Sequence, residues 1–245
     1  MDEKNRIIPA GGTMKYTFKR VEKKYLLSAE KFQALRARLD EYIMPDEYFS
    51  STVCSIYYDT DDYELIRRSI EGPVYKEKLR LRSYNVPAED GEVFVELKKK
   101  YKGVVYKRRV RMRADEAEPY LAMQAPAPKD TQITREIDWF LKTNRPTPKA
   151  FIACDREAYV AVSDPELRIT FDFNMRWRDT DLHLTHGADG EPLVGPGEVL
   201  MEIKIPGTAP LWLASMLSEL EIFPTGFSKY GSCYRSNILQ KYFSE

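Results

Sequence analysis

The sequence has few of the residues that commonly perform acid–base and thiol chemistry. Its 245 residues include only 2 histidines and 3 cysteines. The odd number and wide spacing of Cys54, Cys154 and Cys233 fit neither a disulfide framework nor a CxxC metal site. We therefore expect reduced thiols in a cytoplasmic protein. The scarcity of histidine argues against Ser-His-Asp hydrolysis and other histidine-based catalysis.

Both histidines, His183 and His186, fall in one segment rich in Asp, Gly and Thr. Their spacing would suit a shared metal ion only on a helix, and the composition here is typical of a strand end and a turn. We therefore expect a solvent-exposed pair rather than a zinc site.

The sequence also lacks a long apolar run and an excess of charge of either sign. No stretch approaches the roughly 20 apolar residues of a transmembrane helix, and the first residues are too polar for a signal peptide. The 38 basic and 38 acidic residues cancel, so there is no general reason to expect a nucleic-acid partner. No Walker A motif occurs. A membrane-bound partner stays open, and these patterns do not indicate the oligomeric state.

The length predicts one domain over residues 16–245, preceded by a flexible tail over residues 1–15. Alternating polar and apolar residues predict about eight strands, mostly joined by short turns. Helical periodicity predicts four or five helices, including one capped by Ser28 that runs to Ile43 and two over 210–221 and 232–243. We expect an α+β fold: an eight-stranded antiparallel β-barrel, or tunnel, with helices packed outside it.

The informative feature of these strands is the charge that alternates with their apolar residues. Because side chains point to the two faces of a strand in turn, Arg80 and Arg82 lie opposite Leu81. Across the strands this puts thirteen basic residues against four carboxylates on the charged faces. The basic residues are Arg20, Lys24, Lys78, Arg80, Arg82, Lys98, Lys107, Arg109, Arg111, Arg113, Arg156, Arg168 and Lys204; the carboxylates are Glu22, Glu96, Asp172 and Glu202.

These charged faces could point either to solvent or into the barrel. The polar face of an antiparallel sheet commonly faces water. However, solvent faces usually mix both signs, and the amphipathic helices need an apolar sheet surface to cover. If the helices cover the apolar face, the basic residues line the barrel.

A basic barrel interior requires an anion, because each unpaired buried cation costs several kcal/mol. Nucleoside triphosphates and polyphosphate have the necessary charge density, and arginine binds phosphate oxygens in bidentate fashion. Glu22, Glu96 and Glu202 could hold Mg²⁺ or Mn²⁺, which prefer oxygen ligands. Such a site would act by positioning and charge neutralisation, without a nucleophilic side chain.

Several strand segments resemble the catalytic domain of the vacuolar transporter chaperone (VTC) complex. That domain is a polyphosphate polymerase of the triphosphate tunnel metalloenzyme superfamily. Residues 57–60 and 227–230 also fit, so the resemblance covers about residues 16–243. The segments that carry it are RVEKKYL (20–26), KLRLRSY (78–84), FVELK (94–98), DREAY (155–159), LRITFD (167–172) and LMEIK (200–204).

The resemblance implies an eight-stranded tunnel with basic walls. It implies Glu202 as the principal metal ligand, with Glu22 and Glu96 as secondary candidates. The related triphosphatase and cyclase branch opens with an ExExK motif, whose first Glu is replaced here by Arg20; this departure favours the polymerase branch. The implied catalytic residues are Arg80, Arg82, Lys98 and Lys204, and the implied phosphate-binding residues are Arg20, Lys24, Lys107, Arg109, Arg156, Arg168 and Lys229.

The leading hypothesis is a Mn²⁺- or Mg²⁺-dependent polymerase that transfers the γ-phosphoryl group of ATP to a growing polyphosphate chain. Two alternatives stay open. The same tunnel could hydrolyse inorganic triphosphate, or it could bind polyphosphate without catalysis. ATP or another triphosphate and polyphosphate are thus the expected partners, and nucleic acid is not.

Overall fold

The computed structural model describes residues 21–102 and 104–244. The predicted tail over residues 1–15 and Arg20 lie outside this range, so the division into a tail and a single domain stays a prediction. In the described range, no helix is both long and apolar enough to cross a membrane.

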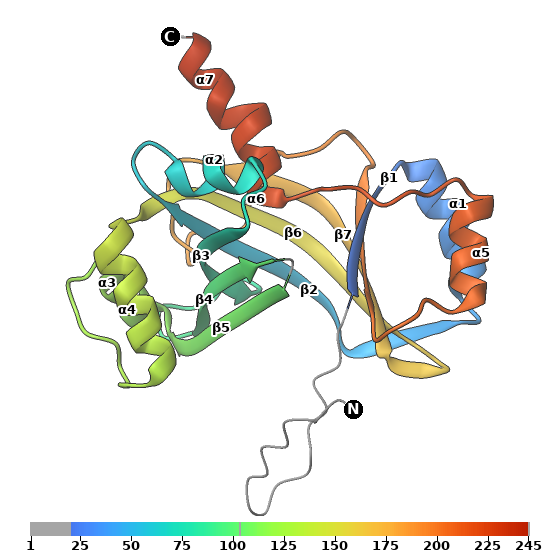
Figure 1. The fold of residues 1–245 in the computed structure, drawn as a ribbon, viewed down its shortest axis with the longest axis horizontal. Helices are drawn as coiled ribbons and strands as arrows, with labels where there is room; N and C mark the ends of the chain where they lie inside the picture. Colours follow the sequence, from blue (N-terminus) through green and yellow to red (C-terminus); the bar gives the residue numbers. More distant parts are fainter. Residues whose placement is uncertain (1–20, 103, 245) are drawn as a thin grey trace, which may run out of the picture.

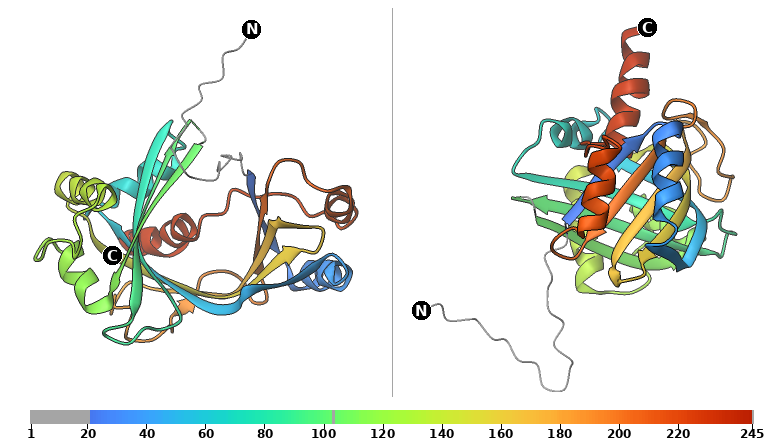
Figure 2. Two further views of the ribbon diagram at one scale, coloured as in Figure 1. Left: turned by 90° about the horizontal axis from the view of Figure 1, so that it is seen from below. Right: turned by 90° about the vertical axis from the view of Figure 1, so that its right-hand side faces the viewer.

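One curved antiparallel sheet dominates the fold (Figures 1 and 2). Its strands follow the order β1-β9-β7-β6-β2-β3-β4-β5, with the short β8 paired to β7. Along the described chain β1 and β5 are edge strands, so the predicted barrel is confirmed but not strictly closed. The strands are β1 Val21–Leu27, β2 Ile43–Asp59, β3 Tyr75–Tyr84, β4 Glu92–Tyr101, β5 Val104–Arg113, β6 Thr147–Ala161, β7 Asp164–Arg178, β8 Glu191–Pro192 and β9 Val199–Ile205.

Helix pairs cover the convex face of the sheet at two places (Figure 2). Helices α3 and α4 cover a core that includes Leu79, Leu81 and Phe140. Helices α1 and α5 cover a second core that includes Leu35 and Ile203. The helices are α1 Ala29–Leu39, α2 Glu64–Ile70, α3 Ala114–Leu121, α4 Gln132–Asn144, α5 Leu211–Glu219, α6 Lys229–Cys233, the π-helical turn η1 Tyr234–Ile238, and α7 Leu239–Ser244.

The C-terminal segment departs from the predicted arrangement, because α6 and η1 pack on the concave side of the sheet (Figure 2). In β2, Cys54 and Ile56 belong to the core under α3 and α4. The alternating residue Tyr57 therefore points to the concave side, where its ring stacks on Tyr230 of α6 at 4.8 Å. Tyr234 of η1 joins the same core. The chain thus fills part of its own concave face.

The first helix is shorter than predicted. Ser28 caps it as expected, since its Oγ accepts a hydrogen bond from the Lys31 backbone N–H at 3.2 Å. The helix ends at Leu39, and Ile43 instead begins β2, which has 17 residues. The first half of β2 is mostly exposed and its pairing is irregular between Pro45 and Ser50, so it lacks the apolar alternation that marks a strand.

Candidate functional site

The basic faces predicted from the sequence meet on the concave side of the sheet. Strand pairing puts Glu96 directly between Arg80 on β3 and Arg109 on β5. In the adjacent row, Lys98 lies directly between Lys78 and Lys107. Leu79, Leu81 and Leu97, which alternate with these residues, are buried under the outer helices. The charged faces therefore point inward, as the helix-covering argument required.

Glu96 is the centre of the first charged cluster, which also contains Arg80, Arg82, Lys107 and Arg109 and is called the Glu96 cluster below. Its carboxylate is 1% exposed and lies 2.6 Å from Arg80 Nη2 and 2.8 Å from Lys107 Nζ. Arg109 Nε donates to it at 2.6 Å, while Arg82 Nε is 3.9 Å away. Burial alone would raise the pKa of Glu96, but the surrounding cations hold that pKa far below its usual range.

A second cluster joins β1, β6, β7, β9 and the start of α6. It consists of Asp172, Glu202, Lys24, Arg156 and Lys229 and is called the Asp172–Glu202 cluster below. Arg156 donates two hydrogen bonds to the fully buried Asp172 carboxylate, at 2.6 and 2.7 Å. Lys229 Nζ donates to Asp172 and lies 3.6 Å from Glu202 Oε1. Lys24 Nζ is 3.2 Å from the same Glu202 atom.

The two carboxylates of this cluster differ in their hydrogen bonding. Both oxygens of Asp172 accept hydrogen bonds, from Arg156 and Lys229. Burial would raise the pKa of Asp172, but these two positive charges hold it at about 2. Glu202 receives no hydrogen bond from the residues the structure describes, although three cations lie within 4.0 Å. Directly across from it, the buried Thr170 Oγ1 also has no hydrogen-bond partner in the described chain. Two adjacent oxygen groups with unused lone pairs fit a hard divalent cation.

The row of lysines beside the Glu96 cluster is the least compensated part of the face. For Lys78 and Lys98, no carboxylate in the described range lies within ion-pair distance, and like charges directly opposite one another destabilise a sheet. Burial, reinforced by Lys76 and Lys24, lowers the pKa of Lys78 to about 7. Burial also lowers the pKa of Lys98. A bound anion would relieve this repulsion.

The remaining predicted site residues lie toward the rim of the face. Lys204 is paired across the sheet with Arg168 on one side and Glu22 on the other. The Arg168 side chain is 54% exposed and lies 3.7 Å from Asp46. Glu22 is 37% exposed and only 3.9 Å from Lys24. Arg168 and Glu22 are therefore close to solvent, whereas the carboxylates at the centres of the two clusters are not.

The family model for the VTC domain matches residues 19–238. This chain belongs to the VTC domain family. The match confirms the resemblance that the strand segments carry. No curated protein matches the chain in sequence.

Two solved structures are similar to this VTC domain at low sequence identity. A candidate adenylate cyclase of Bacillus halodurans has a TM-score of 0.53 and 16% identity, covering 91% of this chain and 97% of that chain. A candidate adenylyl cyclase of Hippeastrum, described as having a dominant triphosphatase activity, has a TM-score of 0.49 and 18% identity, covering 89% and 95%. The first likeness confirms the predicted tunnel fold.

Two hydrogen bonds to the basic face, from residues outside the predicted site, could not be predicted from the sequence. The Tyr57 hydroxyl accepts a hydrogen bond from Arg80 Nη1 at 3.3 Å, and Ser228 Oγ accepts one from Lys78 Nζ at 3.1 Å. Ser228 also caps α6. These contacts exist because α6 packs on the concave face, and no local sequence signal indicated that placement.

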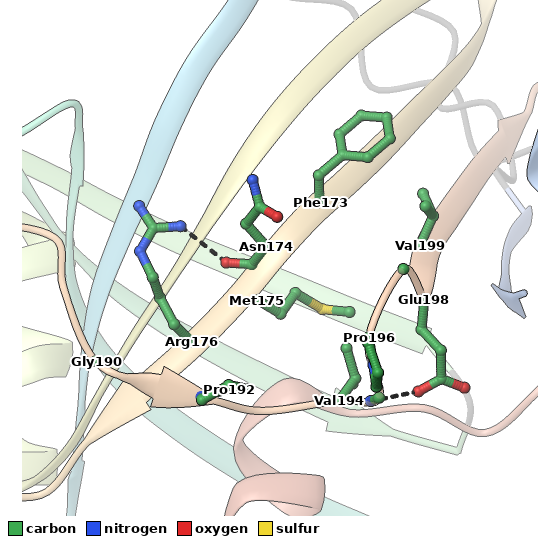
Figure 3. Close-up of a pocket in the computed structure, with 12 residues that line it drawn as sticks. Phe173, Asn174, Met175, Arg176, Gly190, Pro192, Val194, Pro196, Glu198 and Val199 are labelled. Atoms are coloured by element: carbon green, nitrogen blue, oxygen red, sulfur yellow. Dashed lines mark hydrogen bonds between the residues drawn. The ribbon is translucent and has the colours of Figure 1, made fainter. Parts of the chain in front are cut away.

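A separate cavity of about 420 Å³ lies where β7, β8 and β9 approach one another (Figure 3). Its lining is mostly apolar, and both of its charged side chains are engaged. Arg176 Nη1 donates to the Asn174 carbonyl at 2.8 Å, and Glu198 accepts from the Gly195 backbone N–H at 2.7 Å. This cavity therefore does not suit a triphosphate, and the basic concave face is the candidate site.

Lys78→Met should change how stability depends on pH. Because the pKa of Lys78 is near 7 in the folded protein and has a reference value of 10.5, folding releases its proton between these values. The wild type should therefore lose stability relative to Lys78→Met as pH falls from about 10.5 to 7, with a constant difference below 7. Thermal melts across this range measure it, with the exposed Lys142→Met as control. A pH-independent difference would contradict the buried position of Lys78.

Glu96→Gln should destabilise the protein strongly, because it leaves the buried cations of the Glu96 cluster without their counter-charge. We expect a loss of roughly 3–5 kcal/mol in the free energy of unfolding, partly recovered by inorganic tripolyphosphate. Glu92→Gln, on the same strand but in an exposed ion pair with Arg111, should cost no more than about 1 kcal/mol. Urea titrations compare the two variants, and equal losses would show that Glu96 does not organise the cluster.

Proposed function

We propose that this VTC domain is a metal-dependent polyphosphate polymerase acting on the concave face of its sheet. The observation that carries the proposal is the pair Lys78 and Lys98, for which no carboxylate of the described residues lies within ion-pair distance. Lys107 continues this row but is already paired with Glu96. A linear chain of phosphates supplies negative charge along such a row. Among the usual cellular anions, nucleoside triphosphates such as ATP and polyphosphate have this form.

In the proposed reaction, the terminal oxygen of a polyphosphate chain attacks the γ-phosphorus of ATP. The bond between the γ-phosphorus and the β,γ-bridging oxygen breaks, and ADP leaves. The side chains need only position the two phosphate chains and neutralise the charge that develops. This explains why a site without histidine or an exposed thiol would suffice.

The contacts support different roles for the individual cations. Arg80 and Arg109 are held in place by Glu96, so they would present fixed guanidinium edges to a phosphate group. Arg82 lies 3.4 Å from Ser55 Oγ and 3.9 Å from Glu96, farther from this carboxylate than Arg80 is, and so it could turn N–H donors toward a phosphate group. With Lys98 and Lys204 we assign Arg80 and Arg82 to the transferring phosphoryl group. The residues assigned to the rest of the two chains are Arg20, Lys24, Lys107, Arg109, Arg156, Arg168 and Lys229.

Glu202 would hold the metal ion, with Thr170 Oγ1 beside it and substrate oxygens as further ligands. A bound Mn²⁺ or Mg²⁺ neutralises charge on the phosphates and orients them. Glu22 and Glu202 both lie within 4.0 Å of Lys24 Nζ, so Glu22 could supply a second carboxylate for the metal ion. Glu96 fits a metal less well than Glu202, because its nearest cations lie within 2.8 Å of its oxygens, whereas those around Glu202 lie 3.2–3.9 Å away. The three buried free cysteines are compatible with a reducing cytoplasm, where ATP is available.

The purified chain, incubated with ATP and Mn²⁺, should produce ADP and a ladder of polyphosphate on gels. Arg82→Ala should reduce this activity by at least about 100-fold, since one removed transition-state donor typically costs this much. Its melting temperature should hold or rise because a crowded cation is removed. Arg135→Ala, an exposed residue of α4 paired with Asp130, is the matched control and should retain activity.

The products separate this proposal from its two rivals. Free phosphate without polymer would identify a triphosphatase, and tight polyphosphate binding without turnover would identify a binding module. Either outcome would contradict the polymerase while retaining the basic face as the ligand site. An active, stable Arg82→Ala variant would remove the concave face from the mechanism.

Glu202→Gln separates metal binding from phosphate binding. Metal-stimulated turnover should fall by at least about 100-fold, because the variant loses the anionic ligand. Binding of tripolyphosphate without metal should stay equal or tighten, since a negative charge is removed from the face. Calorimetric titration and the gel assay give the two readouts. Loss of metal-free binding would instead assign Glu202 to the scaffold that orders Lys24 and Lys229.

A further inference from the structure

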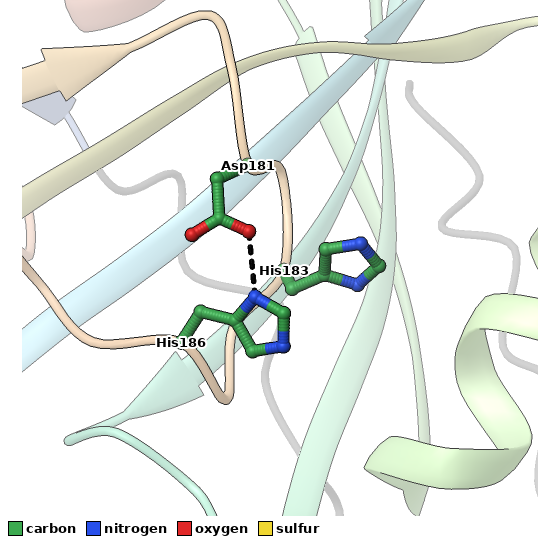
Figure 4. A group of neighbouring side chains, drawn as sticks. All are labelled: Asp181, His183 and His186. Carbon is green, nitrogen blue, oxygen red and sulfur yellow. Dashed lines mark hydrogen bonds and ion pairs between the residues drawn. The ribbon is translucent and has the colours of Figure 1, made fainter.

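The loop between β7 and β8 gathers both histidines of the chain around a carboxylate, outside the concave face (Figure 4). Asp181, His183 and His186 each bring one potential ligand atom within 4.8 Å of the others. His186 Nδ1 lies 2.6 Å from Asp181 Oδ1, and the two imidazole rings are 4.6 Å apart. All three residues are exposed, so a metal ion could reach them.

A second carboxylate comes from another element. Both Oε atoms of Glu118, on α3, lie 3.0 Å from His183 Nδ1. Histidines that bind metals usually donate their other ring N–H to a carboxylate, which fixes the ring orientation. Glu118 occupies that position and leaves Nε2 of His183 for an ion.

The backbone of this loop is fixed by one arginine. Arg178, at the end of β7, donates to the carbonyl oxygens of Asp181 at 3.0 Å, His183 at 3.1 Å and Asp189 at 2.7 Å. Its guanidinium lies over the Phe151 ring, 3.7 Å from the centroid. Ligand side chains on a fixed backbone lose less conformational entropy when they bind an ion.

The electrostatic surroundings also favour a cation. A cavity of about 320 Å³ adjoins the two histidines, and its charged lining residues are Glu89, Glu118 and Asp115, of which Asp115 is paired with Arg113 outside the lining. A concave surface lined by charge of one sign raises the local concentration of the opposite ion.

We propose that Asp181, His183 and His186 bind a divalent transition-metal ion of the zinc class. Glu118 orients His183, and water completes the coordination. Imidazole with one carboxylate suits Zn²⁺, whereas Mg²⁺ prefers oxygen ligands alone. Neighbouring ligand atoms around tetrahedral Zn²⁺ are about 3.3 Å apart, so modest side-chain rotations would close the site. The bound ion would tie the β7–β8 loop to α3.

The test uses the untagged full chain with Zn²⁺ alone. One Zn²⁺ per chain should stay bound through gel filtration, raise the melting temperature and protect both histidines from diethyl pyrocarbonate. His183→Ala and His186→Ala should each abolish retention, and Glu118→Gln should weaken affinity about 10- to 100-fold. Asp189→Asn, which alters an exposed carboxylate of the same loop, should bind normally. Co²⁺ should give the visible absorption of a four-coordinate site.

Two results would overturn the proposal. The first is a wild-type chain that retains no Zn²⁺ and melts at an unchanged temperature. The second is retention that survives both histidine substitutions or disappears in Glu202→Gln, because the ion would then lie on the concave face. Neither result depends on whether the chain makes polyphosphate, since no ATP or turnover is involved.

Discussion

The structure depends on how a small number of carboxylates neutralises many cations on one concave surface. Glu96 and Asp172 are almost fully buried, and each holds several basic side chains by short contacts. Without them the sheet would carry a concentration of positive charge that burial makes expensive. These carboxylates thus stabilise the fold by neutralising the basic side chains around them. Their presence allows β3, β4, β5 and β7 to place arginine and lysine side by side.

The carboxylates do not neutralise every cation of the concave face. The charges left unbalanced lie where the proposed substrate and metal ion would bind. Lys78 and Lys98 beside Glu96 have lowered pKa values. Among the described residues, Glu202 receives no hydrogen bond, and the Thr170 hydroxyl across from it has no hydrogen-bond partner. One region therefore favours an anion and the other favours a divalent cation. The proposed triphosphate–metal complex would satisfy both at once. The C-terminal segment contributes to the same face through Lys229 and Ser228, so folding of α6 and assembly of the site are linked.

Much of the fold and of the basic face could be predicted, because charged and apolar residues alternate strictly along several strands. Leucine and arginine alternate in β3, which fixes both the element and its faces, and the outward leucines require helices to cover them. The inward direction of Arg80, Arg82 and Lys98 followed from that requirement. The family resemblance then added Lys229, which no alternation indicates because it lies on a short helix.

Features that depend on contacts distant in sequence were not predictable. The polar first half of β2 has no apolar alternation, so the helix appeared to continue to Ile43. The packing of α6 inside the curved sheet depends on the Tyr57–Tyr230 stack, which joins residues far apart in the chain. The loop histidines were expected to be a simple exposed pair. They are exposed, but Asp181 and Glu118 lie next to them only because the loop folds back on Arg178 and reaches α3.

A crystal structure of the chain with tripolyphosphate and Mn²⁺ tests the central claim most directly. The account predicts a phosphate chain on the concave face, within hydrogen-bond distance of Lys78, Lys98 and Arg82, with Mn²⁺ on Glu202. A tripolyphosphate bound only on the convex surface or in the cavity beside β8, with the lysine row unchanged, would contradict it.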